Sequence, residues 1–271
     1  AITDESNDQR QVTLVGKTEV YSRELDQPAF VNKIVSADEK SIYVEGWDAT
    51  PVENHLFRIP LNGKPKTQLT KQPGWHQTTF SRDSGVYVDQ FTSIEVPMMI
   101  SVYKSSDNDT KEPTLLHQED ISGQHPYKPF IEFHANSDIG FVESGDGKKI
   151  YYKLTRPTKT RAKAPIIVYV YGGPGVQKVK NEWSSMVVQL FAQNGFGVLE
   201  LDNRGSSNRG RSFEQPIYKS LGGVEIEDQL LGLDMLKEID WADSENVGIF
   251  GHSYGGYMTL MGLCQSTRFC A

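Results

Sequence analysis

Strand-like and helix-like segments alternate along the second half of the chain, and this alternation limits the possible folds more than any other feature. A continuous apolar run, APIIVYVYGG at residues 164–173, is typical of a strand that is buried on both faces. The segments that follow it are helix-like at 183–191, strand-like at 196–202, helix-like at 224–238 and strand-like at 246–250. Strands separated by helices pair in parallel, so this half is predicted to be α/β, with a parallel sheet.

Each of the two helical segments places apolar residues on one side, a pattern typical of a helix face that packs on a core. In the first helix, which is predicted to close at Asn194-Gly195, these residues are Trp183, Met186, Val187, Leu190 and Phe191. In the second helix they are Ile226, Leu230, Leu233 and Leu236. Acidic residues occupy the first turn of the second helix, where the helix dipole favours negative charge.

The first half of the chain consists of short β-branched and aromatic runs separated by turn residues, and it shows an internal repeat. The segment VSADEKSIYVEGW resembles FSRDSGVYVDQF, and the Ser36-x-Asp38 pattern recurs as Ser81-x-Asp83, about 45 residues later. That period suits a propeller blade of four strands. Residues 1–130 are therefore predicted to hold about three blades of a propeller that this chain alone cannot close. A small β-sandwich is the alternative.

Composition excludes several classes of protein. The chain has 271 residues, of which 28 are lysine or arginine and 35 are aspartate or glutamate, a formal net charge of -7. This balance argues against nucleic acid or an anionic membrane as the main partner. No apolar run approaches the roughly 18 residues needed to span a bilayer. Cys264 and Cys270 lack the spacing of a disulfide scaffold or a metal site and are expected to be ordinary free thiols.

Residues 251–255 read Gly-His-Ser-Tyr-Gly, the G-x-S-x-G pattern of a nucleophile elbow. The pattern alone is weak, but here a strand-like segment precedes it and an apolar, helix-like segment follows it, as an elbow requires. Gly251 and Gly255 occupy positions where a sharp turn leaves little room for side chains. Ser253 is therefore the candidate nucleophile; the alternative is a serine at a buried turn without chemistry.

Attack on a carbonyl builds negative charge on its oxygen, and two hydrogen-bond donors must already face that oxygen. The backbone N–H of Tyr254, directly after the serine, is one candidate donor. The second is expected from the loop that follows an earlier strand, which here is Tyr171-Gly172-Gly173-Pro174-Gly175. The Tyr171 hydroxyl is the candidate in that loop; alternatively, Tyr171 is a core aromatic residue at the end of a strand.

Four segments, YVYGGPG, LDNRGSSNRGRSF, LGGVEIEDQL and GHSYGGYM, occur in an order and spacing that resemble the prolyl oligopeptidase family of serine peptidases, most of all its dipeptidyl peptidase IV branch. The resemblance extends from about residue 35 and is strongest over 165–261. It implies a mixed fold, with a partial β-propeller at 1–130 and the N-terminal part of an α/β-hydrolase domain at 131–271.

The resemblance also implies roles for three residues. Ser253 corresponds to the nucleophile, Tyr171 to the tyrosine whose hydroxyl donates to the oxyanion, and Tyr254 to the residue that donates its backbone N–H. Tyr254 would also line the pocket for the residue before the scissile bond. The implied activity is that of a serine exopeptidase, which releases N-terminal Xaa-Pro or Xaa-Ala dipeptides through an acyl-enzyme.

The chain departs from the family in its catalytic acid and base. In the family these residues follow the nucleophile, whereas no His, Asp or Glu follows Ser253 here. His252 is expected to point away from the serine, and structural roles are expected for His55, His76, His117, His125 and His134. The glutamate pair that binds the substrate's amino terminus in this branch has no matching motif.

These departures leave several interpretations open. The chain is expected to be a fragment that lacks early blades and the C-terminal half of the hydrolase domain. The complete protein would be a dipeptidyl peptidase, or a tripeptidyl, acylaminoacyl or oligopeptidase relative, and the 271 residues alone would be a non-catalytic fragment. Salt bridges are the expected role of Arg204, Arg209 and Asp228.

A peptide is the expected substrate, and neither a metal nor an organic cofactor is expected. Neither a nucleic-acid partner nor a membrane span is predicted. The resemblance further implies a homodimer and, for a bacterial protein, a periplasmic or secreted location, although the sequence itself does not determine the compartment.

Overall fold

The structure is a computed structural model that describes residues 12–15, 20–23, 30–106, 112–159 and 163–271. The chain divides into two compact units. The first holds the strands up to Gln118 together with Asn208–Ser212, and the second holds Ile94–Pro97, Glu119–Ser207 and Phe213–Ala271. The domain boundary expected at 130/131 stays a prediction.

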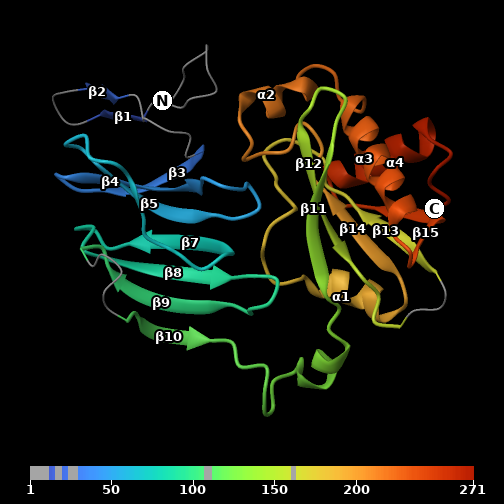
Figure 1. The fold of residues 1–271 in the computed structure, drawn as a ribbon, viewed down its shortest axis with the longest axis horizontal. Helices are drawn as coiled ribbons and strands as arrows, with labels where there is room; N and C mark the ends of the chain where they lie inside the picture. Colours follow the sequence, from blue (N-terminus) through green and yellow to red (C-terminus); the bar gives the residue numbers. More distant parts are fainter. Residues whose placement is uncertain (1–11, 16–19, 24–29, 107–111, 160–162) are drawn as a thin grey trace. The chain divides into compact units, whose positions relative to one another are not determined.

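The first unit contains two four-stranded antiparallel sheets in succession, together with a two-stranded pair (Figure 1). The pair consists of β1 (Val12–Val15) and β2 (Val20–Arg23). The strands of the first four-stranded sheet are β3 (Phe30–Ala37), β4 (Ser41–Trp47), β5 (His55–Pro60) and β6 (Thr67–Gln68). Those of the second are β7 (Trp75–Phe80), β8 (Val86–Thr92), β9 (Met99–Lys104) and β10 (Thr114–Gln118). Such sheets are the blades of the predicted partial propeller.

The sequence repeat corresponds to the same turn in both blades. Asp38 lies between the first two strands of one blade, and its Oδ1 accepts hydrogen bonds from the backbone N–H groups of Lys40 and Ser41, both at 2.7 Å. Asp83 lies between the first two strands of the next blade, and its Oδ1 accepts from Gly85 N at 3.1 Å. An aspartate that bonds to the backbone two residues later stabilises a turn, so the repeated Asp closes each blade's first hairpin.

The second unit contains one mixed sheet of five strands, in the order β11-β12-β14-β13-β15. The strands are β11 (Ser137–Glu143), β12 (Lys149–Thr155), β13 (Ala164–Tyr169), β14 (Gly197–Leu201) and β15 (Ala242–Phe250). The central strand β13 is parallel to both of its neighbours, β14 and β15. The predicted parallel sheet is therefore confirmed, with an antiparallel pair added at one edge.

Helices cover both faces of this sheet. They are α1 (Met186–Gln193), α2 (Arg211–Glu214), α3 (Val224–Met235) and α4 (Tyr254–Gln265), with short 3-10 turns at Lys128–Phe133, Gln215–Ile217 and Leu236–Glu238. Figure 1 shows α3 and α4 side by side. Both pack on the main core, whose members include Ile166, Val168, Leu199, Ile226, Leu233, Val247, Ile249 and Met258. Since successive strand residues point to opposite faces, Phe250 lies on the other face, where its ring is 6.0 Å from that of Phe191 in α1.

The first helix is shorter than predicted, and its apolar side is not the side that is buried. Ser185 caps its N-terminus by accepting from Val188 N, so Trp183 precedes the helix. Leu190 is 61% exposed, and Met186 is 54% exposed. The buried residues of α1 are Val188, Gln189 and Ala192. The prediction that the apolar stripe packs on the core was therefore wrong.

A backbone contact explains this orientation of α1. The side-chain amide of Gln189 bonds to both backbone groups of Ala135, accepting from N at 2.7 Å and donating to O at 3.0 Å. Both residues are almost fully buried. An unpaired backbone group at such a position costs about 1–3 kcal/mol. This two-point hydrogen bond therefore favours the face that carries Gln189.

Candidate functional site

Ser253 lies at a sharp turn between β15 and α4, where its backbone adopts a left-handed conformation, with φ 58° and ψ −121°. Few residues other than glycine adopt a positive φ, because the Cβ atom then crowds the backbone. The side chain of Ser253 is exposed and does not cap the helix. The predicted strand, turn and helix are thus present, with the serine at the point of the turn.

The two glycines of the elbow are required by the end of β13, which passes close to them. A Cβ atom on Gly251 or on Gly255 would overlap the carbonyl oxygen of Val170. Val170 is itself fixed, because its N–H donates to the carbonyl of Phe250 at 2.9 Å. The spacing of the motif therefore allows the elbow to approach the chain segment that leads into Tyr171.

That approach brings Tyr171 and Tyr254 together. Tyr171 lies two residues beyond the end of β13 and is half-buried, and its ring centroid lies 6.2 Å from that of Tyr254. A Cβ atom on Gly173 would overlap the Tyr254 ring, so the loop rests directly on this ring. Tyr254 is the first residue of α4, where backbone N–H groups have no partner within the helix. The structure thus places all three predicted site residues on adjoining segments.

The Tyr254 hydroxyl points to a buried acid. It donates to Glu225 Oε1 at 2.8 Å, and Glu225 is 0% exposed. Burial raises the pKa of the Tyr254 phenol, and the hydrogen bond to Glu225 and its charge raise that pKa further. The phenol is therefore held in its neutral, donating form.

Buried amides hold the loop that carries Tyr171. Gly172 has φ 71°, a conformation that favours glycine, and its carbonyl accepts from Asn203 Nδ2 at 2.9 Å. Gln229 in α3 donates to Asn203 Oδ1, also at 2.9 Å, and both amide residues are 0% exposed. The position of the loop therefore depends on residues from two other segments of the chain.

Arg204 and Asp228 form the ion pair that the sequence suggested. The guanidinium Nη2 lies 2.7 Å from Asp228 Oδ1, and the backbone N–H of Arg204 donates to Oδ2, also at 2.7 Å. The hydrogen bond to Asp228 raises the pKa of the Arg204 guanidinium. Asp228 is 0% exposed, so this pair fixes the start of the loop after β14 onto α3.

A catalytic base is not among the contacts of Ser253. Within the part of the chain that the structure describes, no histidine or carboxylate is hydrogen bonded to its hydroxyl. His252 is exposed beside it. Four other histidines have hydrogen-bond partners elsewhere: His55 with Thr70 and Glu53, His76 with Asp89, His125 with Glu119, and His134 with Tyr127.

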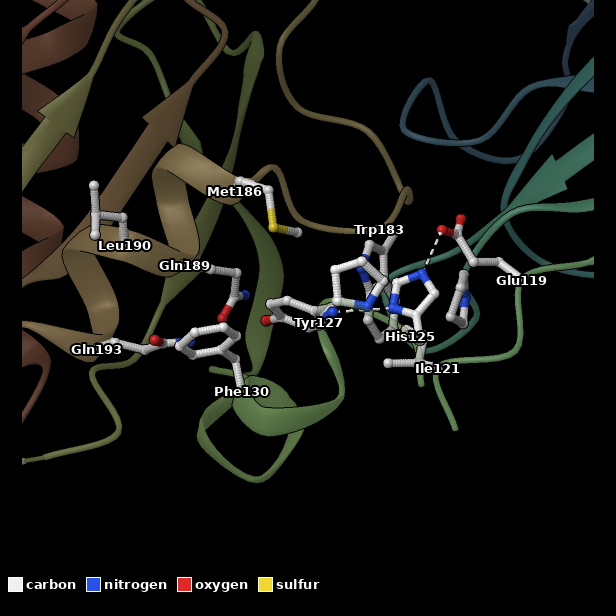
Figure 2. Close-up of a pocket in the computed structure, with 12 residues that line it drawn as sticks. Glu119, Ile121, His125, Tyr127, Phe130, Trp183, Met186, Gln189, Leu190 and Gln193 are labelled. Atoms are coloured by element: carbon white, nitrogen blue, oxygen red, sulfur yellow. Dashed lines mark hydrogen bonds and ion pairs between the residues drawn. The ribbon is translucent and has the colours of Figure 1, made fainter. Parts of the chain in front are cut away.

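A separate cavity of about 540 Å³ lies within the second unit (Figure 2). Its walls are mainly apolar and include Pro97, Ile121, Tyr127, Phe130, Trp183, Met186 and Leu190. Ser253, Tyr171 and Tyr254 are not among its lining residues. Figure 2 shows His125 bonded to Glu119 at one end of it. This cavity is therefore distinct from the elbow.

Sequence reasoning missed three residues that support the site: Asn203, Glu225 and Gln229. Glu225 was interpreted as an acid placed for the helix dipole, whereas it is fully buried and bonded to Tyr254. The available signal was its spacing from Gln229, since residues at i and i+4 share one helix face. Glu225 and Gln229 lie on the side of α3 that also carries Ile226. Polar side chains on such an apolar side are predicted to have buried hydrogen-bond partners.

Several structural findings bear on other classes of site. Over the described ranges, no group of three or more His, Cys, Asp or Glu side chains could hold a metal ion. Cys264 and Cys270 are free and exposed. No helix in the part of the chain that the structure covers is long and apolar enough to cross a membrane.

Two parts of the chain match known families. Residues 182–271 match the family described as "Prolyl oligopeptidase family", and residues 5–98 match "Dipeptidyl peptidase IV (DPP IV) N-terminal region". The second match covers all of the first four-stranded sheet and strands β7 and β8 of the second, which places them in the N-terminal region of such proteins. The succession of four-stranded sheets agrees with the predicted propeller blades rather than with a β-sandwich.

Individual relatives agree with these matches. Dipeptidyl peptidase 8 of Homo sapiens is 32% identical over 247 residues, which are 85% of this chain and 27% of the human protein. Dipeptidyl peptidase 4 of Trichophyton tonsurans is 26% identical over 233 residues, or 83% of this chain and 29% of that protein. The chain thus spans less than a third of the length of either relative.

A solved structure shares the fold. The crystal structure of Porphyromonas gingivalis dipeptidyl peptidase 4 superposes with a TM-score of 0.86 at 22% identity, over 99% of this chain and 38% of the other. At this identity the similarity concerns the fold alone. It confirms a partial propeller followed by the first part of an α/β-hydrolase domain.

Proposed function

We propose that the chain, whose residues 182–271 match the prolyl oligopeptidase family, carries the nucleophile and both oxyanion donors of a dipeptidyl peptidase. The substrate is a peptide whose N-terminal Xaa-Pro or Xaa-Ala dipeptide is released. The observation that carries this proposal is the left-handed backbone of Ser253, which presents an exposed hydroxyl between β15 and α4.

In the proposed reaction the Ser253 hydroxyl oxygen attacks the scissile carbonyl carbon. The carbonyl oxygen becomes an oxyanion, which the backbone N–H of Tyr254 and the hydroxyl of Tyr171 stabilise. Collapse of this intermediate breaks the C–N bond, releases the shortened peptide as an amine and leaves an ester on Ser253. Water then hydrolyses the ester and frees the dipeptide.

The proton of Ser253 must pass to a base, which then delivers it to the leaving amine. In the proposed enzyme that base is a histidine from outside these 271 residues. The absence of a base among the described contacts of Ser253 favours the second candidate function, in which these residues alone form a non-catalytic part.

A fluorophosphonate probe combined with intact mass measurement tests the proposal. We expect one adduct on the wild-type protein, its loss in Ser253→Ala, and full labelling in Ser220→Ala, which changes an exposed serine in the loop before α3. If the 271-residue chain takes up no adduct, the result supports the non-catalytic candidate. If the purified polypeptide is longer and carries one adduct, the result supports the peptidase function.

Substrate length distinguishes a dipeptidyl peptidase from the tripeptidyl and acylaminoacyl peptidases of the family. We expect release of the anilide from Gly-Pro-anilide, and slower release from a tripeptidyl or an N-acylated anilide. Faster cleavage of the tripeptidyl or acylated substrate would assign the protein to a different branch of the family.

A further inference from the structure

Glu225 is a buried carboxylate whose two oxygens are held by groups from two directions. Gly222 N donates to Oε1 at 3.0 Å and to Oε2 at 3.1 Å, and the Tyr254 hydroxyl donates to Oε1 at 2.8 Å. A buried acid without partners is strongly destabilising, so three hydrogen bonds from two donors to one carboxylate indicate a specific arrangement. The acid thereby ties the first turn of α3 to the first residue of α4.

The segment that holds Glu225 is itself fixed. Gly222 has φ 80°, and its carbonyl accepts from Gln265 Nε2, near the end of α4, at 2.9 Å. A Cβ atom on Gly222 would lie 2.5 Å from the hydroxyl oxygen of Tyr257, so this turn packs closely against α4. Glu225 therefore reaches Tyr254 from a fixed position.

The ring of Tyr254 extends this connection to the loop on its other side. It contacts Gly173 closely, lies 6.2 Å from the Tyr171 ring and makes an edge contact with Tyr257 at 5.2 Å. One side of the ring thus supports the loop that carries the Tyr171 hydroxyl. The backbone of the same residue supplies the N–H next to Ser253.

We propose that Glu225 is a positioning residue that sets both oxyanion donors through the hydroxyl and ring of Tyr254. This inference rests on the proposed function of Ser253, Tyr171 and Tyr254. Glu225 does not touch the substrate in this proposal; it fixes the ring on which the Tyr171 loop rests and the first turn of the nucleophile helix. Small displacements of such donors are costly, because their effect depends on preorganised geometry.

The first experiment compares Glu225→Gln with Glu227→Gln, the matched control on the same helix, whose side chain is 72% exposed and makes only a surface ion pair, 3.6 Å from Arg204 Nη2. It uses the full-length peptidase and Gly-Pro-anilide. We expect Glu225→Gln to lower kcat about tenfold while KM changes little, because oxyanion contacts form mainly in the transition state. The control keeps its kcat. A Glu225→Gln variant with a lower Tm and an unchanged kcat overturns the proposal.

A double-mutant cycle with Tyr254→Phe tests the route of the effect. This variant keeps the ring and the backbone N–H but lacks the hydroxyl that binds Glu225. We expect Glu225→Gln to reduce kcat less than twofold in the Tyr254→Phe background. An undiminished tenfold loss there shows that Glu225 acts by another route and overturns the proposal.

A second readout works even if the protein does not turn over substrate, which would contradict the proposed function alone. Fluorotyrosine incorporated at position 171 reports the environment of the Tyr171 loop through its fluorine NMR resonance. We expect Glu225→Gln to shift this resonance, Glu227→Gln to leave it in place, and the shift to vanish in the Tyr254→Phe background. An unshifted resonance in Glu225→Gln overturns the positioning role, whether or not Ser253 reacts.

Discussion

Helices α1 and α3 both depart from simple amphipathic packing, but in opposite directions. The polar residues that α3 buries completely are Glu225, Asp228 and Gln229. The apolar residues that α1 leaves 40–61% exposed are Met186, Val187 and Leu190. In each helix the buried polar side chain has a partner on a loop, such as Asn203 for Gln229 and Ala135 for Gln189. Partners on neighbouring loops, rather than hydropathy alone, decide which helix face is buried.

The largest expected effect concerns Asp228, a charged residue on the buried side of α3. Asp228→Ala leaves the Arg204 guanidinium, with a side chain that is 14% exposed, without its bidentate partner. Breaking a buried pair by removing one member costs about 3–5 kcal/mol. We expect a loss of that size in the free energy of unfolding, measured by urea denaturation.

Asp234→Ala is the control, because Asp234 lies on the same helix but its side chain is 55% exposed. Its ion pairs with Lys237 and Arg268 are worth less than about 1 kcal/mol each at such a surface. Equal losses of unfolding free energy in Asp228→Ala and Asp234→Ala would contradict the interpretation that an ion pair of α3 contributes to stability because it is buried.

The corresponding test on α1 is Gln189→Leu. The substitution keeps the volume but leaves both backbone groups of Ala135 unpaired in a buried position. We expect a loss of about 2 kcal/mol in unfolding free energy, and a change near zero for Gln193→Leu, at a half-buried glutamine of the same helix. An unchanged Gln189→Leu protein would show that apolar packing, not the amide, orients α1.

The elements of the fold could be predicted from sequence because each depends on a short window. The strands of both blades and the repeated turn at Asp38 and Asp83 follow from local patterns. The elbow was also local, since its strand, turn and helix are contiguous around Ser253. The loop at 171–175 was found through its glycines.

The support of the site could not be predicted in the same way. Glu225 and Tyr254 are 29 positions apart, and Asn203 and Gly172 are 31 apart. Such contacts depend on which strands become neighbours in the sheet. A sequence pattern shows that Glu225 lies on a helix face, but not that a tyrosine hydroxyl occupies the space opposite it.

A smaller, pH-dependent effect is expected beside α1. Burial lowers the pKa of His134, whose ring stacks on Trp183 at 4.2 Å and bonds to the Tyr127 hydroxyl. The fold therefore favours the neutral ring. The contribution of neutral His134 to the free energy of unfolding is fully present above the ordinary pKa of about 6.5, and it is lost as the pH falls through the lowered pKa.

Thermal unfolding between about pH 8 and pH 5 measures this effect. We expect the wild-type Tm to fall relative to that of His134→Phe, which keeps the stacked ring but does not titrate, by an amount equivalent to less than about 1 kcal/mol. Parallel pH profiles of the two proteins would show that His134 makes no pH-dependent contribution.

The smallest expected effect belongs to the exposed apolar side of α1. Leu190 is 61% exposed, so Leu190→Gln removes little buried area. We expect the unfolding free energy to change by less than about 0.5 kcal/mol. A loss of 2 kcal/mol or more, far above that range, would show that this side is packed in solution, and the contrast between α1 and α3 would disappear.

The left-handed backbone of Ser253 has an evolutionary consequence. At φ 58° a serine is strained by an amount on the order of 1 kcal/mol, which glycine would avoid. Selection for folding alone therefore favours glycine at this position, and only selection for chemistry retains a side chain. In a lineage whose copy of this domain lost its activity, substitution of position 253 by glycine is expected to be fast. Substitution of Gly251 or Gly255 is expected to stay slow, because the fold itself excludes a side chain there.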